Sequence, residues 1–194
     1  MFLLEYIKNP STIGAVAPSS KYLAEGMMES IDFSTARCIV EYGLGTGVFT
    51  EKILARAKEE TQVILIELNV EFYNELKKKY GYKNNVIIIN ESAENIDKIL
   101  KHHEILKIDY VISGLPFASL PKNTSEAILN KTSRLLKEDG DFITFQYSLF
   151  KKKFIENFFA GIRTKFIMRN FPPAYVLDCK GVKNEWKYFN SWWW

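Results

Sequence analysis

Short β-branched and apolar runs alternate with amphipathic helical stretches along most of this chain. The strand-sized runs are Cys38 to Tyr42, Gln62 to Glu67, Val86 to Asn90, Asp109 to Ser113 and Asp141 to Tyr147. The helical stretches between them are Phe49 to Lys58, Val70 to Tyr80, Ile96 to Lys101 and Ser125 to Leu136. Strands joined by helices of this length form βαβ crossovers. The alternation therefore predicts an α/β fold with a parallel sheet that helices cover on both faces.

Further elements flank this alternation at both ends. Thr164 to Met168 and Ala174 to Cys179 have the pattern of two strands joined by a short proline-containing turn, which predicts a terminal hairpin. Before the first strand we expect a short apolar helix over Phe2 to Ile7 and a second helix from about Lys21 to Ser30. The fold thus consists of one α/β unit with a helical extension at its start.

The composition is that of a single globular domain. Of the 194 residues, 47% are hydrophobic and 25% are charged, so the chain has enough apolar surface to fold. We expect one domain over residues 1–194, with a helical extension over about residues 1–34. No apolar run is long enough for a bilayer span, and no basic leader precedes the first apolar stretch, so we expect no secretory signal. Cys38 and Cys179 are too few for a disulfide framework, which suits the cytoplasm.

Positive charge is concentrated in the last third of the sequence. The segment Lys151 to Lys183 holds eight basic and two acidic residues, a net charge of +6, whereas the rest of the chain holds 18 basic and 21 acidic residues, a net charge of −3. Such a region attracts anionic partners, either lipid headgroups or RNA phosphates. The alternative is a solvated basic face without a partner.

A glycine-rich turn follows the first predicted strand. It consists of Glu41 and then Gly43, Gly45 and Gly47 at alternate positions, and it leads directly into a helix. Glycines allow a sharp turn and a close approach of the backbone to a ligand. Glu67 lies at the end of the next strand, 20 residues after Gly47, where a carboxylate can accept both hydroxyls of a ribose. The pattern predicts a nucleotide site; the alternative is a turn that only joins a strand to a helix.

The spacing of these glycines distinguishes between nucleotide-binding families. It matches neither G-x-G-x-x-G nor the P-loop, and it resembles the E/D-x-G-x-G-x-G motif of class I S-adenosylmethionine-dependent methyltransferases. That resemblance implies a Rossmann-like, mostly parallel seven-stranded sheet that ends in an antiparallel hairpin. It also implies that Glu41 and the Gly43 to Gly47 loop hold the methionine part of the cofactor, that Glu67 holds the ribose, and that Leu68 is a further cofactor contact.

The resemblance implies two more groups of cofactor contacts. After the third strand the family usually has an Asp-Ala pair near the adenine, and this chain has Ser92-Ala93 there, with Glu91 as an alternative acceptor. A hydroxyl accepts a weaker hydrogen bond than a carboxylate does. Near the N-terminus, Ser19 and Ser20 precede the predicted helix; either is a suitable N-cap, and both are assigned to the cofactor site.

The loop after the fourth strand is expected to lie beside the transferable methyl group. It has the sequence Ser113-Gly114-Leu115-Pro116-Phe117. Adenine-N6 methyltransferases carry N-P-P-Y or N-L-P-Y here, with an Asn where this chain has Gly114. Without that amide a planar exocyclic amine loses a polar partner. A flexible alkyl amine needs only backbone acceptors and an aromatic face, for which we assign Phe117, with Tyr147 as a helper and no general base.

Four elements together narrow the resemblance to bacterial phospholipid N-methyltransferases. These elements are G-A-V-A-P-S-S near the N-terminus, the S-G-L-P loop, F-Q-Y-S and N-F-P-P-A. The resemblance implies methylation of phosphatidylethanolamine and its methylated intermediates by a cytoplasmic enzyme bound peripherally to the inner face of the membrane. Lys165 and Arg169 are assigned to the lipid phosphate, and the alternative is that they are surface charges on an edge strand. The chain also resembles ribosomal RNA adenine dimethylases, and a cofactor-binding module without turnover is a second alternative.

A lipid acceptor requires contact with the membrane surface, and three segments are candidates. The first, which we favour, is the apolar cluster within Phe2 to Lys8, and the last is the tryptophan-rich stretch Trp186 to Trp194. Between them, Phe150, Phe154 and Phe158 recur at helical spacing beside three lysines; the alternative for this stripe is a place in the core. Adjacent His102 and His103 point different ways on a helix, so no metal site is expected there.

Overall fold

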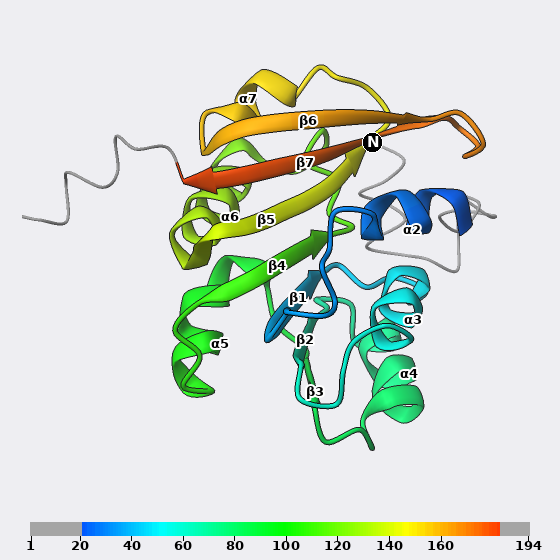
Figure 1. Ribbon diagram of the computed structural model, residues 1–194, viewed down its shortest axis with the longest axis vertical. Helices are drawn as coiled ribbons and strands as arrows, with labels where there is room; N and C mark the ends of the chain where they lie inside the picture. The colour runs from blue at the N-terminus through cyan, green and yellow to red at the C-terminus, as the bar shows by residue number, and fades with distance from the viewer. Residues whose placement is uncertain (1–20, 183–194) are drawn as a thin grey trace, which may run out of the picture.

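The computed structural model describes residues 21–182, which form one seven-stranded sheet between two layers of helices (Figure 1). The strands are β1 Cys38–Tyr42, β2 Gln62–Ile66, β3 Val86–Ile89, β4 Ile108–Ser113, β5 Leu136–Gln146, β6 Phe159–Ile167 and β7 Ala174–Val182. The helices are α2 Lys21–Met28, α3 Val48–Leu54, α4 Val70–Tyr80, α5 Ile96–His102, α6 Lys122–Leu135 and α7 Lys152–Glu156, with a short 3-10 turn η1 at Ala93–Asn95.

The strand order is β3-β2-β1-β4-β5-β7-β6. Strands β1 to β5 pair in parallel, whereas β7 lies antiparallel between β5 and β6. The predicted parallel sheet with an antiparallel terminal hairpin is therefore confirmed. The carboxyl ends of the five parallel strands lie along the same side of the sheet, which we call the carboxyl edge, and such folds bind their ligands there.

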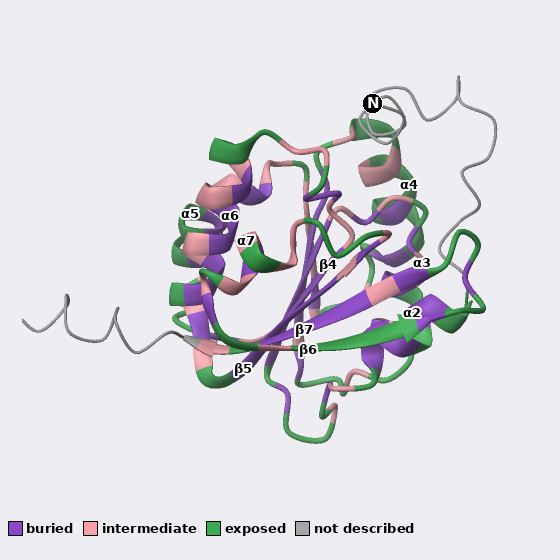
Figure 2. Cartoon of the chain, turned by 90° about the horizontal axis from the view of Figure 1, so that it is seen from above, coloured by how far each residue is buried: buried purple, intermediate pink, exposed green. Residues whose placement is uncertain are grey.

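Apolar residues on both faces of the central strands explain the two helical layers. In β2, Val63 and Leu65 pack into the core with α2, α3 and α4, while Ile64 and Ile66 pack into the core with α5, α6 and α7. Figures 1 and 2 show these two groups of helices on opposite sides of the sheet. Burial on both faces requires the near-continuous apolar runs that the sequence shows.

Two strands begin five residues earlier than predicted. Strand β5 starts at Leu136, which pairs with Ile108, and a register irregularity follows before the regular pairing of Tyr110 with Asp141. Strand β6 starts at Phe159 rather than at Thr164. Residues 137–140 are Lys, Glu, Asp and Gly, and only Phe159 is buried in the early segment of β6, so neither segment shows the apolar alternation that predicts a strand.

The phenylalanine stripe does not lie on one helix. Helix α7 has only five residues, so Phe150 precedes it and Phe158 follows it. The rings of Phe154 and Phe158 lie edge to face at 5.6 Å and pack against the core, whereas Phe150 is 86% exposed. The three phenylalanines therefore do not form the candidate interfacial helix, and the core alternative is confirmed for Phe154 and Phe158.

Several predicted features lie outside the described residues. These are the helix over Phe2 to Ile7, the serines Ser19 and Ser20, and the tryptophan-rich stretch. Helix α2 is the described part of the predicted N-terminal extension. Between residues 21 and 182, no helix has the length and apolar character needed to cross a membrane.

Candidate functional site

The glycine loop between β1 and α3 forms an open cradle. Gly43, Gly45 and Gly47 have φ angles of 66°, 50° and 80°, a left-handed region that favours glycine. A Cβ on Gly43 would lie 2.8 Å from Leu115 Cδ2, whereas a Cβ on Gly45 would have no atom within 4 Å. The middle of the loop therefore borders free space, as a ligand cradle requires.

Glu67 lies directly over this loop, as its spacing from the glycines predicts. Its Oε2 accepts a hydrogen bond from the backbone N of Gly45 at 3.0 Å, and its Oε1 accepts one from Asn69 N at 2.8 Å. The residue is 5% exposed, while the adjacent Leu68 is 64% exposed. The carboxylate and a large apolar side chain thus flank the cradle on the side of β2.

Glu41 is a buried carboxyl group beneath the loop. Its Oε2 accepts a hydrogen bond from Thr50 Oγ1 at 2.7 Å, and its Oε1 has no hydrogen-bond partner in the described part of the chain. Burial raises the pKa of Glu41 to about 8, opposed by the Thr50 hydrogen bond and increased by the charge of Glu67. A cationic ligand group supplies the compensation that this carboxyl group lacks, so the site fits the ammonium-bearing methionine part of S-adenosylmethionine.

The loop after β3 completes this side of the site through a residue that the sequence analysis missed. Asn90 Nδ2 donates hydrogen bonds to the carbonyl oxygens of Glu67 at 2.8 Å and Leu68 at 3.0 Å, which fastens the ends of β2 and β3 together. An amide as the last residue of a predicted strand was the signal that could have identified it. Ser92 Oγ accepts from Glu94 N at 3.2 Å and caps η1, with buried Ala93 beside it. The predicted adenine contacts are therefore adjacent to the Glu67 region, with the Ser92 hydroxyl engaged in a cap.

The loop after β4 is pressed against the glycine loop. Gly114 N donates to Tyr42 O at 2.8 Å, and a Cβ on Gly114 would lie 2.5 Å from the carbonyl oxygen of Gly43. No side chain fits there without a shift of the backbone, so glycine is needed for the close approach. Ser113 is buried, and its Oγ accepts from Leu115 N at 3.2 Å. The glycine loop and the loop after β4 are therefore in direct contact.

Phe117 does not present its ring to an open site. The ring is fully buried and lies edge to face with Phe142 at 5.9 Å, in the core beneath α6. This corrects the expectation of an aromatic face beside the reacting amine: Phe117, next to buried Pro116, supports the loop from below. Tyr147 is half-buried directly after β5, 5.6 Å from the Phe145 ring, and burial raises the pKa of its hydroxyl, which stays neutral near pH 7.

Lys165 and Arg169 lie on and just after edge strand β6, and both are exposed. Lys165 Nζ forms an ion pair with Glu29 of the segment after α2, and the Arg169 guanidinium lies 5.3 Å from the ring centre of Tyr22. Tyr175 pairs with both Gln146 of β5 and Phe166 of β6, so the end of β6 lies at the same sheet edge as the glycine loop. Of the two basic residues, Arg169 has no carboxylate partner among residues 21–182, which favours it for an anionic group.

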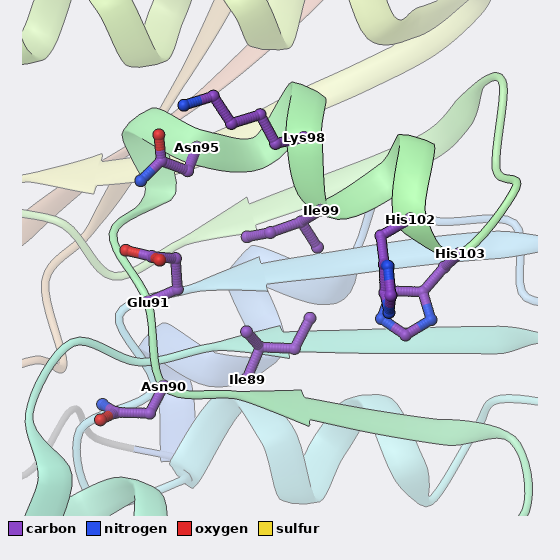
Figure 3. A pocket seen from close by; sticks show the side chains of 8 residues that line it. All are labelled: Ile89, Asn90, Glu91, Asn95, Lys98, Ile99, His102 and His103. Atoms are coloured by element: carbon purple, nitrogen blue, oxygen red, sulfur yellow. The ribbon is translucent and has the colours of Figure 1, made fainter.

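A cavity of about 480 Å³ lies between β3 and α5 (Figure 3). It is lined by Ile89, Asn90, Glu91, Asn95, Lys98, Ile99, His102 and His103. The two histidine rings lie at the far end from Asn90 and Glu91 (Figure 3), with their centres 5.0 Å apart. Among residues 21–182, no group of three or more His, Cys, Asp or Glu residues has the arrangement of a metal site. The cavity thus borders the loop that carries Ser92 and holds no evident catalytic group.

Comparison with known proteins agrees with this geometry. Residues 39–140 match the family described as "Methyltransferase domain". The chain is 30% identical over 187 residues to ornithine lipid N-methyltransferase of Singulisphaera acidiphila, a match that covers 95% of this chain and 97% of that protein. It is 32% identical over 111 residues to ribosomal RNA small subunit methyltransferase A of Hydrogenobaculum sp., which covers 57% of this chain and 40% of that protein.

Solved structures show the same fold. The precorrin-6y C5,15-methyltransferase of Geobacter metallireducens superposes with a TM-score of 0.65 at 12% identity, covering 88% of this chain and 94% of that chain. A 16S rRNA methyltransferase of T. Thermophilus in complex with AdoMet and guanosine superposes with a TM-score of 0.64 at 19% identity, covering 88% of this chain and 45% of that chain. At these identities the likeness concerns the fold alone.

Proposed function

Because the chain belongs to the family of S-adenosylmethionine-dependent methyltransferases, we propose that it methylates the amine of a membrane lipid. The proposed acceptors are phosphatidylethanolamine and its methylated intermediates at the surface of a membrane. The observation that carries this proposal is the contact between Gly114 and the Gly43 carbonyl. This close approach leaves no room for a side chain at the position where adenine-N6 methyltransferases carry an Asn amide. The loop therefore provides only backbone carbonyl oxygens as hydrogen-bond acceptors for an amine.

The residues of the cradle have separate tasks in holding the cofactor. Glu41 compensates the cationic methionine part, Glu67 accepts hydrogen bonds from the ribose, and Leu68, Ser92 and Ala93 border the adenine. When bound, S-adenosylmethionine supplies an electrophilic methyl group on a sulfonium leaving group. The protein therefore has to orient the acceptor rather than activate the methyl group.

The acceptor amine must approach with a free lone pair. The carbonyl oxygens of Gly114 and Leu115 accept its hydrogens, and the neutral Tyr147 hydroxyl is a further partner. Burial beside this loop disfavours the ammonium form and lowers the amine pKa. Arg169 is the proposed contact for the lipid phosphate because a guanidinium group matches phosphate geometry with two donors. Lys165 is the second candidate, and it must first exchange its partner Glu29.

Methylation of an RNA adenine is the second candidate function, because of the similarity to ribosomal RNA small subunit methyltransferase A. The lipid proposal is supported by two facts that this alternative lacks. The relative named for a lipid acceptor aligns along 97% of its length, whereas the ribosomal RNA relative aligns along 40%. Gly114 also leaves no room for the amide that a planar adenine amine would contact.

One assay distinguishes these functions. Labelled S-adenosylmethionine is offered to phosphatidylethanolamine vesicles, to ornithine lipid vesicles and to undermethylated ribosomal RNA. Label in mono- or dimethylated phosphatidylethanolamine supports the proposal. Label in ornithine lipid alone would show that the acceptor is a lipid amine with a different headgroup from the proposed one. Label in RNA alone refutes it, and tight cofactor binding without label in any acceptor favours a module without turnover. Gly43→Val serves as the inactive control, since its Cβ would overlap Leu115 at a φ of +66°.

A further inference from the structure

Exposed apolar side chains are concentrated near the carboxyl ends of β5 and β6. Ten large hydrophobic side chains between residues 21 and 182 are exposed. Six of them belong to the first turn of α2, the β5–α7 loop, and the end of β6 with the turn after it: Tyr22, Leu149, Phe150, Phe166, Met168 and Phe171. We call these six residues the apolar rim. Exposed apolar groups gathered on one part of a surface mark a contact with a partner.

The pairing of the strands brings the parts of the rim together. Tyr175 of β7 pairs with Gln146, the last residue of β5, and with Phe166 of β6, so the β5–α7 loop starts about 10 Å from Phe166. The rings of Phe166 and Tyr175 lie 4.9 Å apart, and Arg169 lies over Tyr22. Figure 1 shows the β6–β7 turn reaching beyond the sheet beside α2. The rim therefore borders the same sheet edge as the glycine loop.

Local hydrogen bonds hold the outermost side chains away from the core. Asn170 is 4% exposed, and its Nδ2 donates to Pro172 O at 2.7 Å, which fixes the turn that carries Phe171. Lys152 N donates to Leu149 O at 3.0 Å and closes the turn that carries Phe150. Phe150 and Phe171 are each 86% exposed, and Met168 is 74% exposed. These turns keep the apolar side chains in water rather than against the protein.

The charge around the rim indicates the chemistry of the partner. Residues 147–153 and 163–171 contain six basic residues and no acidic residue. Three of them, Lys152, Arg163 and Lys165, form ion pairs with acidic residues of neighbouring segments, and the other three are Lys151, Lys153 and Arg169. Basic groups next to protruding apolar side chains match an anionic bilayer, where the charges meet headgroups and the apolar groups enter the interface. RNA would use the charges but would leave Met168 and Leu149 in water.

We propose that the apolar rim lies on an anionic lipid bilayer, with Phe150, Met168 and Phe171 inserted among the headgroups. The inference rests on the proposed lipid acceptor and adds the orientation of the enzyme. The carboxyl edge of the sheet faces the bilayer, so the S-G-L-P loop opens towards the lipid amine. The cofactor cradle and the membrane contact then share one edge of the fold.

The test compares two double variants of the full chain. Met168→Ser/Phe171→Ser removes apolar surface from the rim, and Tyr82→Ser/Leu106→Ser removes similarly exposed apolar surface elsewhere, since Tyr82 is 75% and Leu106 85% exposed. Co-sedimentation is measured with phosphatidylcholine vesicles with and without phosphatidylglycerol. We expect the rim variant to bind anionic vesicles at least about tenfold more weakly and the control variant to bind like the wild type. Equal binding of all three proteins overturns the proposal.

A second measurement separates this proposal from the proposed function. Methyl transfer is measured on phosphatidylethanolamine in vesicles and in detergent micelles, where no bilayer has to be approached. Support requires that the rim variant loses activity on vesicles and keeps it in micelles. If the wild type methylates micellar lipid and the rim variant is as active on vesicles as the wild type, the docking surface is refuted. The proposed function is then still supported. Rim-dependent binding to structured RNA, without binding to vesicles, overturns the docking surface as well.

Discussion

The buried carboxyl group of Glu41 leads to a prediction about protons. Its pKa of about 8 means that at pH 7 about nine-tenths of this group is protonated before the cofactor binds. A cationic ligand group beside the unpaired Oε1 favours the ionised form and lowers the pKa. Cofactor binding at pH 7 should therefore release about 0.9 proton from Glu41, and affinity should rise by close to tenfold per pH unit below pH 7.

Calorimetry measures this release directly. Binding heats are compared at pH 7 in buffers of different ionisation enthalpy, for the wild type and for Glu41→Gln, in which the amide keeps an acceptor for Thr50. The difference between the two proteins isolates Glu41 from protons that the ligand itself exchanges. The same number of protons released by both proteins would refute the assignment of Glu41 to the cationic part of the cofactor.

The same group makes stability depend on pH in a known direction. Between the ordinary carboxyl value of 4.5 and about 8, the folded protein holds a proton on Glu41 that the unfolded chain has lost. The free energy of unfolding without cofactor therefore falls as pH rises through this window, by at most about 5 kcal/mol. Glu41→Gln should remove that fall, which denaturation at pH 5 and pH 8.5 would reveal. A wild-type fall that persists in the variant would show that other groups cause it.

Other parts of the site give three more expected results. Glu67→Ala removes the carboxylate above the glycine loop and should raise the cofactor Kd by roughly tenfold or more; an unchanged Kd in calorimetry would contradict the ribose assignment. Gly114→Ala should cost about 1–3 kcal/mol of stability and most of the activity because of overlap with a carbonyl oxygen, whereas Gly161→Ala, where a Cβ meets no atom within 4 Å, should melt like the wild type. Deleting Met1 to Lys8 should reduce co-sedimentation with vesicles; if the shortened protein sediments equally, that segment is not an anchor.

The parts of the fold that depend on apolar runs could be predicted from the sequence. Strand β1 has the expected bounds because all five of its residues are buried, and helix α4 begins where expected because the side chain of Asn69 caps it. The early start of β5 could not be predicted, since residues 136–140 have no apolar alternation. That start depends on pairing with Ile108 and on Gly140, whose Cβ would lie 2.8 Å from a carbonyl oxygen. Edge strand β6 has an exposed face, so its pattern is equally weak.

In the site, the sequence spacing of residues on neighbouring strands and turns predicted which of them lie close together. Contacts between loops that are far apart in the sequence could not be predicted in this way. The spacing of 20 residues between Gly47 and Glu67 predicted that this carboxylate lies beside the glycine loop, because neighbouring parallel strands end on the same side of the sheet. The role of Gly114 required the position of the Gly43 carbonyl, which only the fold supplies. Phe117 was misplaced because an aromatic after a proline can turn to either side of its loop, and here the ring of Phe142 receives it.

The reversed direction of β7 has a consequence for protein engineering. Because β7 runs back along β5, Val182 emerges at the edge of the sheet where the parallel strands begin, a nine-residue strand or roughly 30 Å away from the cradle. A fluorophore or affinity tag attached after this point starts on the side remote from the methyl-transfer chemistry. If the opposite edge rests on a bilayer, such a label protrudes into the aqueous phase and reports on the height of the enzyme above the lipid.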